Sequence, residues 1–136
     1  MYPTVTDQLR ELRRVLNDVV MPEVSGSYAR DTLSTAMATL QMLEGAWDRV
    51  LPFLLWDNEQ LTALVGELEP QSEPPDPSDF TAVHRRNLDL RDRLAGRIRD
   101  GQEVGPAPPI AALTAYFRAR IARYPFASTV ALPTRK

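Results

Sequence analysis

"ARDTLSTAMATLQMLEGAWDRVLPFL", residues 29–54, is the stretch of sequence that decides the fold. Apolar residues recur in it at alternating steps of four and three, which places them on one face of an α-helix. The repeat runs over about four heptads, a pattern typical of a long helix packed against other helices. Pro52 removes one backbone donor inside the repeat, but the phase survives, so we predict a kink there. The stripe consists of Ala29, Leu33, Ala36, Leu40, Leu43, Trp47, Val50 and Leu54.

Four further segments also show helical spacing. The first begins after Thr4, which is predicted to form a capping box with Asp7, and Pro22 ends it. Residues 57–68 are predicted to form a short separate helix capped by Asp57. A further helix runs from Phe80 to Gly101, after a cap at Ser78 or Asp79. The apolar stripe of the first segment consists of Val5, Leu9, Leu12, Leu16 and Val19.

The last helix begins near Pro109, where a missing backbone donor costs nothing, and Pro125 ends it. We predict that its buried face consists of Ile110, Leu113, Phe117, Ile121 and Tyr124. No segment before the C-terminal tail alternates as a strand does. The sequence therefore predicts an all-α fold, an antiparallel bundle of four main helices plus one short helix.

The length of 136 residues is that of one domain, and we predict a single helical domain over residues 1–136. Residues 69–79 contain four prolines and four acidic residues and no large apolar side chain. We predict that this segment is a mobile connection, because it has nothing to bury.

The charges are distributed unevenly. Residues 1–79 carry 5 arginines and 14 acidic residues, whereas residues 80–136 carry 11 basic and 4 acidic residues. Two interpretations stand: the halves neutralise each other within one fold, or they attract a partner or a second copy. Together with the long stripe of the second helix, this asymmetry leads us to expect a homodimer. The net charge of −2 and an aromatic content of 7% argue against nucleic-acid binding.

The chain has no cysteine, its N-terminus lacks the pattern of a signal peptide, and no apolar run is long enough for a membrane span. We therefore expect a cytoplasmic protein that does not use a membrane. The phosphate-binding, nucleophile-elbow and metalloprotease motifs are absent, and one histidine is too few for the usual zinc ligand sets, so we expect no cofactor and no metal. Glu44 and Asp48 lie four residues apart, and we expect them to meet arginines such as Arg49.

The stretch "AVHRRNLDLRDRLAGRIRDG", residues 82–101, contains the candidate ligand site. On a helical wheel Asn87 falls in the middle of the apolar face, while His84 and Arg91 fall along one edge of it. Arg85 points to solvent. One interpretation is structural, with Asn87 bonded to Arg91 or to backbone near Pro52. The other is a groove beside this helix in which His84, Asn87 and Arg91 bind a small anionic ligand.

The segment "SYARDTLSTAMATLQMLEGAWDRVLPFLLWDNEQLTALV", followed by "HRRNLDLRDRLAGRIRDG" and a last helix ending "ARYPF", resembles a family of uncharacterised bacterial helical domains. Members occur alone or fused behind aminoglycoside-phosphotransferase-like kinases. The resemblance covers roughly residues 7–124, and the proline-rich segment 69–79 departs from it. It implies an accessory role beside a kinase-like protein and supplies no catalytic residues.

These observations favour an accessory or protein-interaction domain without its own catalysis, with a kinase-like protein as a partner. The alternative is a small-molecule binding protein or enzyme that uses the groove beside the helix of residues 80–101. A pocket with convergent polar groups would favour the alternative, and an exposed apolar patch would favour the interaction domain.

Overall fold

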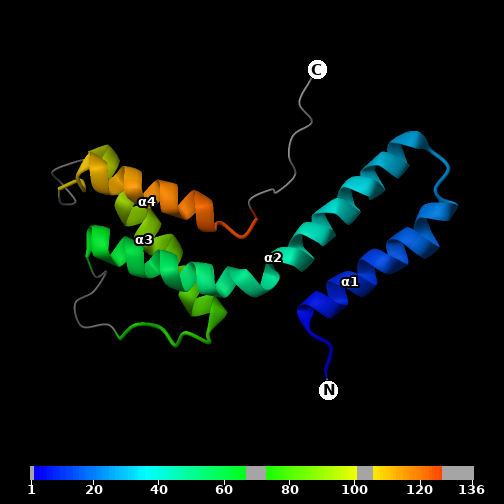
Figure 1. Ribbon diagram of the computed structural model, residues 1–136, viewed down its shortest axis with the longest axis horizontal. Helices are drawn as coiled ribbons and strands as arrows, with labels where there is room; N and C mark the ends of the chain where they lie inside the picture. Colours follow the sequence, from blue (N-terminus) through cyan, green and yellow to red (C-terminus); the bar gives the residue numbers. More distant parts are fainter. Residues whose placement is uncertain (1, 67–72, 101–105, 127–136) are drawn as a thin grey trace. The chain divides into compact units, whose positions relative to one another are not determined.

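The computed structural model describes residues 2–66, 73–100 and 106–126. These residues form helices joined by turns, without a strand, so the all-α class is confirmed for them. The antiparallel arrangement of one bundle stays a prediction. The elements, in chain order, are α1 (Val5–Val15), the π-helical turn η1 (Leu16–Val20), the 3-10 turn η2 (Met21–Glu23), α2 (Ser27–Val65), α3 (Phe80–Asp100) and α4 (Ile110–Arg123) (Figure 1).

The chain divides into two compact units, and the boundary falls inside α2. Unit 1 comprises Met1–Arg49 together with Pro125–Lys136, and unit 2 comprises Val50–Tyr124. We refer to α1 and residues 27–49 of α2 as the hairpin, which makes up most of unit 1.

Helix α2 is longer than predicted. It continues through Pro52 without ending, and residues predicted to form a separate short helix are its last turns. The prediction of a fifth, separate helix at residues 57–68 is therefore wrong. The helix ends where Gly66 takes φ +76°, a left-handed conformation that glycine adopts without strain. Its N–H donates to the carbonyl of Thr62 at 2.8 Å and closes the last turn.

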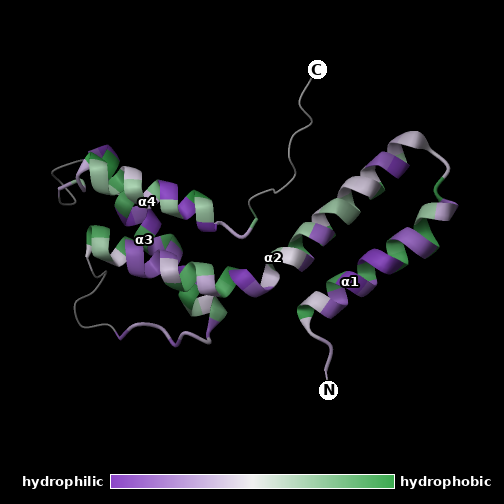
Figure 2. Cartoon of the chain, in the orientation of Figure 1, coloured by the Kyte–Doolittle hydropathy of each residue, from purple (hydrophilic) through white to green (hydrophobic). Residues whose placement is uncertain are grey.

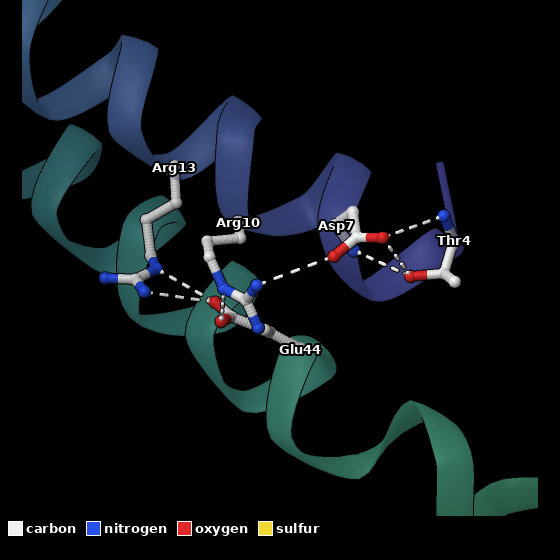
Figure 3. Close-up of polar contacts among 5 residues, drawn as sticks. All are labelled: Thr4, Asp7, Arg10, Arg13 and Glu44. Atoms are coloured by element: carbon white, nitrogen blue, oxygen red, sulfur yellow. Dashed lines mark hydrogen bonds and ion pairs between the residues drawn. The ribbon is translucent and has the colours of Figure 1, made fainter. Parts of the chain in front are cut away.

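The predicted capping box of α1 is present in unit 1 (Figure 3). The Thr4 hydroxyl accepts from the backbone N–H of Asp7 at 3.1 Å, and the Asp7 carboxylate accepts from the N–H of Thr4 at 3.0 Å. The turn that follows η2 is held by Arg30, which donates to the carbonyls of Met21 and Val24. The capping box thus fixes the start of α1, and Arg30 fixes the turn between the two helices of the hairpin. Nevertheless, α1 contains no fully buried residue.

Unit 2 has the larger apolar core, which forms two clusters. The Asp79 carboxylate caps α3 by accepting from the N–H of Ala82 at 3.1 Å, as predicted for one of two candidate residues. Asn87, which the helical wheel placed on the apolar face of α3, is buried along with Val83, Leu90 and Leu94, whereas Ile98 near the end of the helix is half exposed. The clusters are Leu61, Val65, Leu90, Leu94 and Tyr116, and Phe53, Leu54 and Val83.

The buried face of α4 differs from the predicted one. Tyr116 is its buried residue, and the predicted Leu113 packs against the same cluster, whereas Ile110, Phe117 and Ile121 are exposed. Apolar spacing located the stripe of α4 correctly but assigned it to the core, because a period of 3.6 does not say which side of a helix is covered. Of the predicted mobile segment 69–79, residues 69–72 lie outside the described residues. In the remainder, Asp76 accepts from the N–H and the hydroxyl of Ser78.

Candidate functional site

The centre of unit 2 contains a buried carboxylate, Asp57, which is 0% exposed. Its Oδ1 accepts a hydrogen bond from the hydroxyl of Tyr116 at 2.7 Å. Its Oδ2 accepts from Nδ2 of Asn87 at 2.9 Å and from Nε of Arg120 at 3.3 Å. Buried charges require such partners, because an unpaired one is costly to desolvate. The carboxylate thus joins α2, α3 and α4 at one point.

Asn58 and Asn87 extend this centre. Asn87, 1% exposed, also donates from Nδ2 to Oδ1 of Asn58 at 2.9 Å. Asn58 in turn donates from its own Nδ2 to the backbone carbonyl of Val83 at 3.1 Å. Both amide hydrogens of Asn87 are therefore used inside the unit. We refer to Asp57, Asn58, Asn87, Tyr116 and Arg120 as the polar centre.

Two electrostatic features follow from burial. Burial, together with the hydrogen bond and the negative charge of Asp57, raises the pKa of the Tyr116 phenol above its usual range. The guanidinium of Arg120 lies 5.3 Å from the ring centroid of Phe53 and 5.7 Å from that of Tyr124. Stacking against aromatic faces suits a guanidinium that is partly withdrawn from water. These contacts hold the polar centre in one arrangement, and the carboxylate of Asp57 is shielded from solvent.

The three predicted ligand residues do not come together. Asn87 points inward as predicted, but its partners are Asp57 and Asn58 rather than Arg91 or backbone near Pro52. His84 is exposed, with its ring 5.8 Å from that of Phe80, and Arg91 is exposed as well. Arg85 is exposed as predicted.

Sequence reasoning missed Asp57, Tyr116 and Arg120. A usable signal existed, because Asp57 lies three residues after Leu54 and four before Leu61, both of which are core residues. Its assignment as a helix cap concealed this signal. The expected partner of Glu44 is also corrected. Its carboxylate meets Arg10 and Arg13 of α1 at 3.0 and 3.1 Å, whereas Arg49 donates to the carbonyls of Gly45 and Pro125 (Figure 3).

A groove of about 430 Å³ lies in unit 2 beside α3. Asn58 connects it to the polar centre, and neither His84, Asn87 nor Arg91 lines it. Its other lining residues are Leu55, Glu59, Thr62, Pro74, Pro75, Asp76, Pro77 and Arg86. It is thus a groove beside the predicted helix, formed by different residues from those predicted.

Apolar side chains also lie on the surface. On α4, Ile110 is 82% exposed, Ile121 is 72% exposed, and Phe117 between them is half exposed. These positions fall within about 40° of one another on a helical wheel. We call Ile110, Phe117 and Ile121 the α4 stripe. Figure 2 shows apolar positions recurring along α4, and also along α1.

No protein family, curated protein or solved structure matches the chain. Within residues 2–66, 73–100 and 106–126, no group of three or more histidine or acidic side chains is arranged to hold a metal ion. Over the same part of the chain, no helix combines the length and apolar character needed to cross a membrane.

Proposed function

We propose that the chain is an accessory interaction module without its own catalysis, which docks on a partner protein through the α4 stripe. The observation that supports this function is the exposure of Ile110, Phe117 and Ile121 on one side of one helix. Large apolar side chains that are aligned in this way are costly to leave in water, and they mark interaction sites. Their spacing of seven and four residues is that of a helix laid into a groove.

The charges of α4 indicate the kind of groove. The helix contains Arg118, Arg120 and Arg123 and no acidic residue. Arg120 is directed at Asp57, while Arg118 is exposed one turn from Ile121. An apolar groove with an acidic rim would complement this surface. A kinase-like protein, which the family resemblance implies, is the first partner to test.

The polar centre supports a role without catalysis. Asp57 accepts three hydrogen bonds and has no exposed surface, so a substrate has no access to its oxygens. A general base must reach the proton that it abstracts. The geometry of this centre therefore suits the positioning of helices.

The test compares two neighbouring, exposed positions of α4. Ile121→Glu places a charge in the stripe, whereas Ala122→Glu places the same charge about 100° away from it. We expect tagged wild-type protein and Ala122→Glu to retain the same partner from a lysate of the source organism, and Ile121→Glu to lose it. Equal retention by both variants would contradict docking through the stripe.

The groove beside α3 supports a second candidate function, the binding of a small anionic ligand. Arg86, Asn58 and Thr62 supply polar groups, and Leu55 with three prolines supplies an apolar wall. Small carboxylates and phosphates would be screened by their effect on the melting temperature. A shift that is lost in Thr62→Trp, which fills the groove, and kept in the exposed Ala63→Trp would support it. The absence of any shift in the wild type would argue against it.

A further inference from the structure

The hairpin of unit 1 has two distinct faces. Each helix of an antiparallel pair can be viewed from its own N-terminus. Side chains that are rotated in the same sense away from the contact between the two helices then lie on the same side of the pair. One side carries Arg10 and Arg14 of α1 and Asn17 of η1 with Ser34 and Gln41 of α2, and these line a groove of about 510 Å³. The opposite side carries apolar residues from both helices. We call this side the apolar face; it consists of Val5, Leu12 and Val19 with Ala29, Ala36 and Leu43.

The apolar face is left uncovered within the unit. Leu12 is 48% exposed, and Val5 and Val19 are exposed too. The members follow one another at intervals of seven residues on both helices, the repeat of helices that pack in bundles. In a pair of helices, each helix buries only the apolar residues that face its partner helix. A second layer is needed to bury the residues of the apolar face.

Helix α2 is unusually free of charge along the hairpin. The twelve residues "TLSTAMATLQML", 32–43, contain no charged side chain. The hydroxyls of Thr32, Thr35 and Thr39 donate to the backbone carbonyls four residues earlier, at 2.8 to 3.1 Å, so their methyl groups remain for packing. Small side chains of this kind let another helix approach closely without leaving a polar group unsatisfied.

We propose that the apolar face binds the same face of a second copy of this chain, so that two hairpins form a four-helix bundle. The charges beside the face permit identical surfaces to meet. Arg14 pairs with Glu11 at 2.6 Å and lies 3.8 Å from Asp18, so one guanidinium offsets part of the charge of these two carboxylates within each copy, and residues 32–43 carry no charge at all. A surface with so little charge favours a partner surface that is also apolar and nearly uncharged, which a second copy supplies. The seven-residue repeat on both helices gives each copy the same row of apolar side chains, so the two identical faces can pack against each other.

The experiment measures the mass of the full chain by sedimentation over a range of concentrations. We expect a dimer for the wild type and for Ser34→Glu, which adds a charge on the opposite side of α2. Ala36→Glu should weaken association by more than about tenfold, because it buries a carboxylate without a partner. Ala36 is exposed in one copy and glutamate is a good helix former, so the helix content of this variant should stay that of the wild type.

The remaining outcomes separate this dimer from other arrangements. A dimer that survives in both Ala36→Glu and Leu12→Glu would overturn the proposal, as would a monomeric wild type at the highest soluble concentration. A monomer that dimerises after removal of residues 127–136 would assign the face to the chain's own C-terminal segment. The proposal does not depend on the α4 stripe, so Ile121→Glu should remain dimeric, and its dissociation would assign self-association to α4 instead.

Discussion

At the scale of single residues, one carboxylate determines how unit 2 is held together. Asp57 brings donors from α3 and α4 to one point on α2. Polar groups in a core stabilise a unique arrangement only when all of them are satisfied. The network is therefore more sensitive to the loss of one member than an apolar contact of the same size.

Asn87 tests this sensitivity. Asn87→Leu removes one donor from Asp57 and one from Asn58, which we expect to cost roughly 1–3 kcal/mol of unfolding free energy. Asn87→Asp should cost more, about 3–5 kcal/mol, because it sets a second carboxylate against Oδ2 of Asp57. Denaturant titrations measure both, with the exposed Arg85→Ala as a control that should stay within about 0.5 kcal/mol of the wild type. Equal stability of Asn87→Asp and the wild type would show that this position is not buried.

Tyr116 gives a prediction in the alkaline range. Its pKa is raised in the fold above the usual value of 10.0, so folding favours the neutral phenol. This contribution is fully present below about pH 10 and is lost as the pH rises further. Tyrosinate absorbance should therefore show one late ionisation that coincides with unfolding. Tyr116→Phe should lose this step, along with about 1.5–3 kcal/mol of stability, and Tyr28→Phe, at an exposed site, should keep it. Ionisation of all four tyrosines before unfolding would contradict the prediction.

The sequence allowed part of this centre to be predicted. The wheel placed Asn87 among apolar neighbours correctly, since the phase of a helix is fixed by its own sequence. The partner of Asn87 could not be found in the same way, because it comes from a different helix, 30 residues away in the chain. The error at Asp57 has a local cause: a kink predicted at Pro52 made an aspartate five residues later resemble the cap of a new helix.

At the scale of elements, spacing predicted the helices well and the covered sides poorly. Helix α2 keeps its phase through Pro52, which agrees with the uninterrupted stripe of residues 29–54. The stripes of α1 and α4 exist as predicted, but parts of both remain exposed. Periodicity reports that a helix is amphipathic, whereas burial depends on whether another element is present to cover it.

The ion pairs between α1 and α2 predict how the hairpin responds to acid. Hydrogen bonds from Arg10 and then Arg13 lower the pKa of Glu44 below its usual value of 4.5, and contacts with Thr4 lower that of Asp7. A lowered pKa contributes stability above the unfolded value, and this stability is lost as the pH falls below about 4.5. We expect amide exchange in α1 to accelerate as the pH falls through this range, once the intrinsic pH dependence of exchange is removed.

Glu44→Gln is the matching variant. It should already exchange faster in α1 at neutral pH and should lose part of the acid response, while Asp7 retains the rest. Glu59→Gln removes the same charge from the same helix but in unit 2, and it should exchange in α1 as the wild type does. An acid response of the same size in Glu44→Gln and the wild type would show that the contacts of Glu44 with α1 do not hold the hairpin (Figure 3).

At the scale of the whole molecule, the two units differ in what holds them. Unit 2 has both apolar clusters and the polar centre, while α1 in unit 1 has no buried residue. Helices in water draw most of their stability from packing of an apolar face rather than from intrinsic propensity. Composition and length, which describe the chain as a whole, could not reveal this difference.

The difference leads to a prediction for the intact chain. Amides of α3 and of the second half of α2 should exchange only through global unfolding, because they surround the buried clusters. Amides of α1 should exchange through local opening at a much lower free energy. If the apolar face binds a second copy, protection in α1 and in residues 32–43 should rise with protein concentration by mass action, while protection in α3 changes little. Hydrogen exchange followed by mass spectrometry at two concentrations measures each segment separately, and Ala36→Glu should remove the concentration dependence. Protection in α1 equal to that of α3 at the lower concentration would show that the hairpin is stable without a partner, because its own contacts would then suffice to cover it.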